Sequence, residues 1–133
     1  MNDALSERQK RTRLLVGDAG IERLRNAHVL VLGIGGVGAY AAEHLARAGI
    51  GRLTLVDGDA VELSNCNRQL PALSSTLGRP KAEVMAERLR EINPELTVEA
   101  RVEFIKPEDV GALLDTGFDY VVDAIDSLAS KVA

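Results

Sequence analysis

The chain of 133 residues contains one cysteine, no tryptophan, and only two tyrosines and two phenylalanines. The single cysteine, Cys66, excludes an internal disulfide and a zinc site made only of this chain's cysteines. No apolar run approaches the roughly 20 residues that a membrane-spanning helix needs. The first residues are polar and charged, unlike a secretory leader. We therefore expect a cytoplasmic protein that does not enter a membrane.

The composition is that of one ordinary soluble domain, with 46% hydrophobic residues, 27% charged residues and a net charge of −4. Residues 1–26 carry six basic and four acidic side chains. This weak basic bias falls far short of the charge pattern of a nucleic-acid-binding surface. Charge alone therefore does not indicate a nucleic-acid partner.

Helical and strand patterns alternate along the chain. Apolar runs predict strands at residues 27–32, 51–57, 96–102 and 118–124. Ser6 is expected to cap a first helix that Gly17 ends, and further helices are expected at residues 19–26, 37–48, 80–92 and 107–114. This alternation predicts a Rossmann-like, doubly wound α/β fold with a mainly parallel sheet in the strand order 3-2-1-4.

A glycine-rich turn joins the first predicted strand to the helix that follows it. The run Gly33-Ile34-Gly35-Gly36-Val37-Gly38 matches GxGxxG at positions 33, 35 and 38. Glycines allow a tight turn and a close approach of the backbone to a phosphate, and the start of the helix offers free N–H groups. The motif predicts a nucleotide site in the crevice between the first and fourth strands.

The residues around this turn bear on which nucleotide binds. Asp57 ends the second predicted strand and is placed to bond a ribose, which ATP and NAD both carry. Arg68, in the loop of residues 64–69, and Lys81 supply cations that a triphosphate needs more than a dinucleotide does. Asp126, after the fourth strand, would be a natural Mg²⁺ ligand beside phosphates. A NAD-binding oxidoreductase fragment and a nucleotide-binding module without catalysis remain open as alternatives.

Four segments, in order, resemble one family of enzymes. GIGGVG, LVDGDAVELSNCNRQ, GRPKAEVMAERLREINPE and VVDAIDS together resemble the ubiquitin-activating-type (E1-like) adenylating enzymes, the group that contains ThiF, MoeB and HesA. The resemblance covers about residues 11–128. Within the group, NxNRQ, RAGIGRLTLVD and KAEVMAER look most like the bacterial tRNA threonylcarbamoyladenosine dehydratases. Activators of ubiquitin-like carrier proteins tend instead to have a Leu-Gln pair before the arginine.

The resemblance implies ATP-dependent adenylation of a carboxylate, with Mg²⁺ as a cofactor and pyrophosphate as a product. For a dehydratase, the carboxylate belongs to the threonylcarbamoyl group of a tRNA adenosine; the alternative acceptor is the C-terminus of a ubiquitin-like sulfur-carrier protein. We therefore expect residues 1–26 to form an N-terminal helical segment and residues 27–133 to form an ATP-binding Rossmann-like domain.

The resemblance also assigns roles by position. Arg68 and Lys81 would be catalytic, as would Arg13, which would reach the ATP of the other protomer in a homodimer. Asp126 would bind Mg²⁺, although Ser127 stands where many relatives have asparagine. The implied nucleotide contacts are Gly33, Gly35, Gly36, Gly38, Asp57, Asp59, Ser64, Asn65, Arg68 and Lys81.

The sequence ends at Ala133, a few residues past the fourth predicted strand. Members of the family continue with further strands and a substrate-facing half. We therefore expect a truncated form of the fold that binds ATP weakly and lacks full turnover.

Overall fold

The computed structural model describes residues 7–125, and its centre is a four-stranded parallel sheet. The strands lie in the order β3-β2-β1-β4, which confirms the predicted topology. The central strand β1 has Leu30 and Val31 fully buried, as expected of an apolar run covered on both faces. The four strands are His28–Leu32 (β1), Arg52–Val56 (β2), Thr97–Arg101 (β3) and Tyr120–Asp123 (β4).

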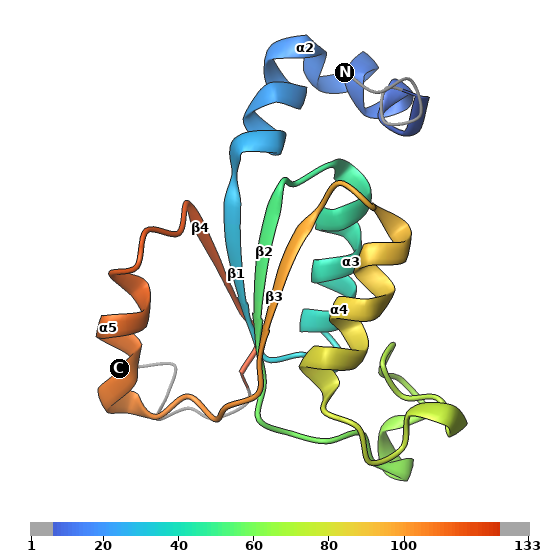
Figure 1. Ribbon diagram of the computed structural model, residues 1–133, viewed down its shortest axis with the longest axis vertical. Helices are drawn as coiled ribbons and strands as arrows, with labels where there is room; N and C mark the ends of the chain where they lie inside the picture. Colours follow the sequence, from blue (N-terminus) through green and yellow to red (C-terminus); the bar gives the residue numbers. More distant parts are fainter. Residues whose placement is uncertain (1–6, 126–133) are drawn as a thin grey trace.

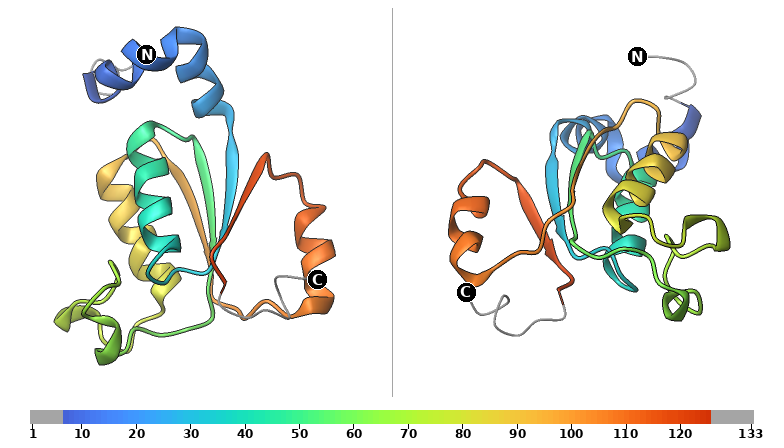
Figure 2. Two further views of the ribbon diagram at one scale, coloured as in Figure 1. Left: turned by 180° about the vertical axis from the view of Figure 1, so that it is seen from behind. Right: turned by 60° about the horizontal axis from the view of Figure 1, so that its bottom comes forward.

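Helices cover the two faces of the sheet unequally. The helices α3 (Gly38–Ala48) and α4 (Lys81–Ile92) lie side by side on one face, and the short helix α5 (Val110–Leu114), which follows the turn η3 (Pro107–Asp109), lies on the other (Figures 1 and 2). Gly49 ends α3 with a left-handed backbone, φ 101°. Asn93 ends α4 as predicted.

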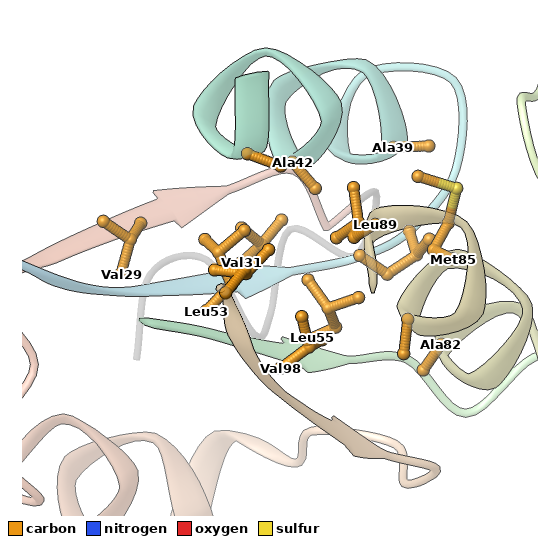
Figure 3. Packing of buried hydrophobic residues seen from close by; sticks show 14 of the residues in the cluster. Val29, Val31, Ala39, Ala42, Leu53, Leu55, Ala82, Met85, Leu89 and Val98 are labelled. Atoms are coloured by element: carbon orange, nitrogen blue, oxygen red, sulfur yellow. The ribbon is translucent and has the colours of Figure 1, made fainter. Parts of the chain in front are cut away.

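The main core lies between the sheet and the pair α3 and α4. Val31 and Leu53 of the sheet pack with Met85 and Leu89 of α4, and small side chains such as Ala42 let α3 approach the strands closely (Figure 3). A smaller cluster of Leu30, Leu32, Val56 and Leu113 forms the core on the α5 face. The smaller cluster includes Leu32 and Val56, the last residues of β1 and β2, next to the predicted site.

The first described helix, α2 (Lys10–Asn26), lies at the amino ends of the strands (Figure 1). Its backbone breaks at Gly17, with φ 71° and ψ 177°, so the predicted pair of short helices is correct. Gln9 is buried against Gly49, and the Arg8 guanidinium donates to the carbonyl of Ile92 over 2.7 Å. The predicted cap, Ser6, lies outside the described residues. None of the helices in the described part of the chain is long and apolar enough to cross a membrane.

The segment between β2 and α4 was expected to be a long polar loop, and it contains two short 3₁₀ turns. They are η1 (Leu63–Asn65) and η2 (Ser74–Thr76). Val61, Ala72 and Val84 form a small apolar cluster beneath the segment, and Ala60 pairs with Pro80 in an isolated bridge. The segment is therefore a packed structure that leads the chain from the end of β2 to the start of α4.

Candidate active site

A cleft of about 530 Å³ opens at the carboxyl ends of the strands. This is the end of a parallel sheet at which ligands bind in doubly wound folds. The cleft is bounded by the glycine turn after β1, the end of β2, the start of α4 and the segments that follow β3 and β4. Of the predicted site residues, it brings together Gly33, Gly35, Gly36, Asp57, Asp59, Arg68 and Lys81.

Two glycines of the motif are required by the fold itself. Gly33 has φ 91°, and a Cβ added there would lie 2.7 Å from the carbonyl oxygen of Ala124. A Cβ at Gly38 would lie 1.6 Å from the carbonyl oxygen of Gly33. Gly33 and Gly38 therefore let the turn close tightly beside the segment after β4. Gly38 does this from behind the cleft and does not line it.

The other two glycines leave the cleft open. A Cβ at Gly36 would meet no atom within 4 Å, and one at Gly35 would meet only the side chain of Gln69, at 3.5 Å. Neither residue has a positive φ. Packing within residues 7–125 therefore does not require glycine at either position. Bare backbone here leaves space for a group that approaches the main chain closely, as a phosphate does.

Asp57 connects the ends of β1 and β2. Its Oδ2 accepts a hydrogen bond from the backbone N–H of Ile34 over 2.6 Å, and its Oδ1 accepts one from the N–H of Asp59 over 2.7 Å. Each carboxylate oxygen can accept a further bond. Asp57 is half-buried and lines the cleft, so this remaining capacity is available to ligand hydroxyls.

Lys81 is a largely buried residue that brings a positive charge to the cleft. The residue is 6% exposed and begins α4, where its backbone N–H donates to the carbonyl of Asp59 over 3.0 Å. Its ammonium makes no hydrogen bond or ion pair with any other described residue. A lysine that is largely buried loses part of its hydration, and an anion can replace what is lost. An anion bound in the cleft could be that partner.

Arg68 also lines the cleft and is exposed. Its guanidinium donates to the carbonyl of Ser64 over 3.1 Å and to the Asn67 side chain over 2.9 Å. Ser64 contributes this carbonyl but does not itself line the cleft. Asn65 is buried in η1, where its Oδ1 accepts the N–H of Glu62 over 2.9 Å. The two predicted contacts Ser64 and Asn65 thus shape the loop that presents Arg68.

Arg13 and Asp126 are not among the cleft residues. Arg13 lies on α2, at the opposite end of the sheet (Figure 1), where it pairs with Asp18 over 2.8 Å. It is therefore remote from the cleft of its own chain, and its contact across a homodimer stays a prediction. Asp126 lies outside the described residues, so its role as a metal ligand also stays a prediction. Residues 7–125 contain no group of three or more acidic, histidine or cysteine side chains placed to hold a metal ion.

The sequence reasoning missed several residues that line the cleft. Gln69 belongs to the quoted motif, and its buried Oε1 has no partner among the described residues. Gly58, Glu103 and Phe104 form the wall beyond Asp57. Their positions in the sequence could have indicated them, because Glu103 and Phe104 follow the end of the third strand just as Asp57 follows the end of the second. Only the fold brings the two segments together.

This site lies on a parallel sheet of the Rossmann-like α/β class. It combines a bare glycine turn, a carboxylate at the end of β2 and a buried lysine. The model of the ThiF family matches residues 7–133, and the chain belongs to this family.

Relatives agree in sequence and in fold. The chain is 53% identical over 113 residues to the tRNA threonylcarbamoyladenosine dehydratase of Haemophilus influenzae, covering 85% of this chain and 43% of that relative. It matches the crystal structure of the Escherichia coli dehydratase, TcdA, in complex with ATP, with a TM-score of 0.93, 47% identity, and coverage of 97% of this chain and 55% of that one. The molybdopterin-synthase adenylyltransferase of Salmonella typhimurium is 41% identical over 115 residues, 84% of this chain and 45% of that relative. The chain thus spans about half the length of the relatives it matches.

Proposed function

We propose that this chain binds ATP in the cleft and takes part in the adenylation of a carboxylate on tRNA threonylcarbamoyladenosine. The observation that carries the proposal is Lys81, a residue that is 6% exposed, borders the cleft and has no anionic partner for its ammonium among residues 7–125. It lies in one cleft with Gly36, whose bare backbone leaves room for a phosphate. The similarity to a dehydratase crystallised with ATP supports the identity of the nucleotide.

The chemistry asks for positioning and charge neutralisation. A carboxylate oxygen of the threonylcarbamoyl group attacks the α-phosphorus of ATP, the bond from that phosphorus to the bridging oxygen breaks, and pyrophosphate leaves with the electron pair. Cyclisation of the resulting acyl adenylate then expels AMP, which carries away one carboxylate oxygen. No covalent nucleophile from the protein is needed, so the exposed Cys66 has no part in this step.

Five of the cleft residues have a role in this scheme. Asp57 accepts from the ribose hydroxyls with the lone pairs that its two backbone contacts leave free. Lys81 and Arg68 bond the phosphate oxygens and offset the charge that builds up on the departing pyrophosphate. Gly35 and Gly36 admit the phosphates close to the main chain.

Mg²⁺ fits this donor set. The carboxylates that line the cleft are Asp57, Asp59 and Glu103. Mg²⁺ on a nucleotide is held by one or two carboxylates together with phosphate oxygens and water, so a cluster of protein ligands is not needed. When bound, it would neutralise phosphate charge, and Asp126 is the ligand that the sequence predicts for it.

A homodimer would complete the site. Arg13 lies at the opposite end of the sheet from the cleft, so only a second copy could bring it to the phosphates. The neighbouring side chains Leu14 and Leu15 are strongly exposed on α2, as expected of a surface that another subunit covers. We place this protein in the cytoplasm, in keeping with its tRNA substrate.

Activation of a ubiquitin-like sulfur carrier is the alternative within the same chemistry. The 41% identity to the molybdopterin-synthase adenylyltransferase supports this alternative. It ranks second because the identity to the H. influenzae dehydratase is higher, at 53%. Both functions share the nucleotide and the attack at phosphorus. They differ in the acceptor alone.

Exchange of labelled pyrophosphate into ATP tests the proposal. The full chain is incubated with tRNA that carries threonylcarbamoyladenosine, with the same tRNA lacking the modification, and with a carrier protein ending in Gly-Gly. We expect exchange only with the modified tRNA. Exchange with the carrier alone would establish the alternative function. Binding of NAD without exchange in any arm would overturn adenylation itself.

A further inference from the structure

The wall of the cleft beyond Asp57 carries an exposed aromatic ring. Phe104 is one of only two phenylalanines in the chain, and it is 67% exposed although it borders a cleft. A large apolar side chain left this open gains little from the hydrophobic effect in the unliganded protein. Its placement is therefore better explained by what enters the cleft than by the core.

Gly58 fixes the orientation of this ring. A Cβ added at Gly58 would lie 2.5, 2.6 and 2.7 Å from Cγ, Cδ2 and Cδ1 of Phe104. Three nearly equal distances place that point over the face of the ring and not beside its edge. One face of the ring thus rests on the bare Cα of residue 58. Because that face is covered, the exposure of Phe104 comes from the opposite face and the rim.

The open face lies where a nucleobase would be. Gly58 is the chain neighbour of Asp57, which faces the ribose in the proposed function. The cations come from the segment before α4, in the case of Arg68, and from the start of α4, in the case of Lys81. Phe104 belongs instead to the segment that follows β3, where its neighbour Ile105 packs on the α5 face. A nucleotide whose phosphates lie toward Lys81 and whose ribose lies at Asp57 therefore extends its base toward Phe104.

We propose that the open face of Phe104 stacks on the nucleobase and makes the cleft selective for purine over pyrimidine triphosphates. The inference rests on the proposed function for the presence of a nucleotide, and it adds a specificity-determining residue and the reason for glycine at position 58. Stacking of a base on an aromatic side chain is sequence-tolerant but grows with the area of the base, so purines gain more than pyrimidines. Gly58 contributes by letting the ring lie flat.

The test compares the affinities for ATP and CTP, measured by calorimetry on the full chain and on three variants. Phe104→Ala removes the platform and should raise the Kd for ATP about 10-fold, with a smaller effect on CTP. Gly58→Ala keeps every ring atom of Phe104 but displaces the ring. Like Phe104→Ala, it should lower the ratio of the affinity for ATP to the affinity for CTP. Tyr120→Ala is the control, because Tyr120 is similarly exposed, at 70%, and does not line the cleft.

A fluorescent variant gives a readout of stacking itself. The chain has no tryptophan, so emission from Phe104→Trp arises from that position alone. We expect saturating ATP to quench this emission more than saturating CTP does, with ATP affinity retained. Two results would overturn the inference and leave ATP binding in place. One is a ratio of ATP affinity to CTP affinity that does not change in Phe104→Ala. The other is Phe104→Trp emission that ATP does not alter. Failure of the unsubstituted chain to bind ATP would overturn the proposed function and this inference with it.

Discussion

Asp57 and Ile34 join the ends of the two central strands through a single hydrogen bond. The Asp57 carboxylate, at the end of β2, accepts the backbone N–H of Ile34 in the glycine turn after β1, over 2.6 Å. The second carboxylate oxygen accepts the N–H of Asp59 in its own loop. The Asp57 side chain therefore positions the glycine turn and also faces the cleft. The conformation of the turn and ligand binding thus depend on the same carboxylate.

Replacement of this carboxylate by an amide should reduce both stability and sugar recognition. Asp57→Asn has one acceptor oxygen where the carboxylate has two, so one of the two backbone N–H groups loses its partner. We expect the free energy of unfolding to fall by about 1–3 kcal/mol. We also expect the preference for ATP over 2′-deoxy-ATP, measured by calorimetry, to shrink. Asp115→Asn, at an exposed site after α5, is the control. Full discrimination by Asp57→Asn would remove the residue from ribose binding.

Alanine at two positions of the glycine turn should separate folding from binding. Gly38→Ala places a methyl group 1.6 Å from the Gly33 carbonyl oxygen, so it should destabilise the fold by about 2–3 kcal/mol. Gly36→Ala meets no atom within 4 Å and should leave stability within about 0.5 kcal/mol of the parent. The same methyl group would obstruct a phosphate, so ATP binding should fall at least 10-fold. Urea denaturation and calorimetry on both variants check this, and unchanged ATP affinity in Gly36→Ala would contradict it.

The strand order was predictable because local patterns and topological rules point the same way. The apolar run before Gly33 is short and rich in valine and leucine, which favours a buried strand, and the glycine turn and the alanine-rich helix after it leave few alternatives. The ends of the strands were less certain, because the flanking residues leave the sheet at points that tertiary contacts decide. The predicted strand of residues 118–124, for example, is reduced to Tyr120–Asp123.

The site was predictable where its residues share a motif and was missed where they do not. Arg68 and Lys81 were identified from charge in the right context, and both line the cleft. Asn65 belongs to the same motif, but the fold uses its side chain to cap η1, a contact that no sequence pattern distinguishes from ligand binding. Phe104 lies far from the motif in sequence, and its orientation depends on a glycine that only the folded chain brings beneath it.

Protonation of His28 should weaken the fold as the pH falls. Burial, and then the charge of Arg52, lower the pKa of His28 below its ordinary value. Its Nε2 lies 2.8 Å from Oγ1 of the fully buried Thr54, and its ring meets that of Phe118 edge-on at 4.5 Å. Because the unfolded chain binds the proton more readily, the free energy of unfolding should fall as the pH drops through the ordinary histidine pKa of about 6.5.

Urea denaturation at pH 7.5 and pH 5.5 measures this effect. His28→Gln should show a smaller loss of stability between the two pH values than the parent chain does. His44→Gln is the matched control, because His44 is exposed on α3 and is the only other histidine in the chain. An equal loss in the parent and in His28→Gln would show that other groups cause the pH dependence.

Removal of the Lys81 charge should change stability and activity in different directions. Lys81→Met keeps the length and apolar stem of a largely buried side chain but removes an ammonium that has no anionic partner among residues 7–125. Because this largely buried side chain has no anion to pair with in the unliganded protein, the variant should be at least as stable as the parent, by up to about 1 kcal/mol. Pyrophosphate exchange should nevertheless fall roughly 100-fold, since a cation that offsets phosphate charge is lost.

A variant that keeps its stability but loses pyrophosphate exchange identifies Lys81 as a binding residue and not a structural one. If Lys81 served mainly to hold α4 in place, Lys81→Met would lose stability and activity together. Lys106→Met removes an exposed lysine that does not line the cleft, and it should leave both quantities unchanged. Addition of ATP provides a second comparison, because a ligand that binds only the folded state raises the melting temperature. That rise should be present in the parent and in Lys106→Met, and largely absent in Lys81→Met.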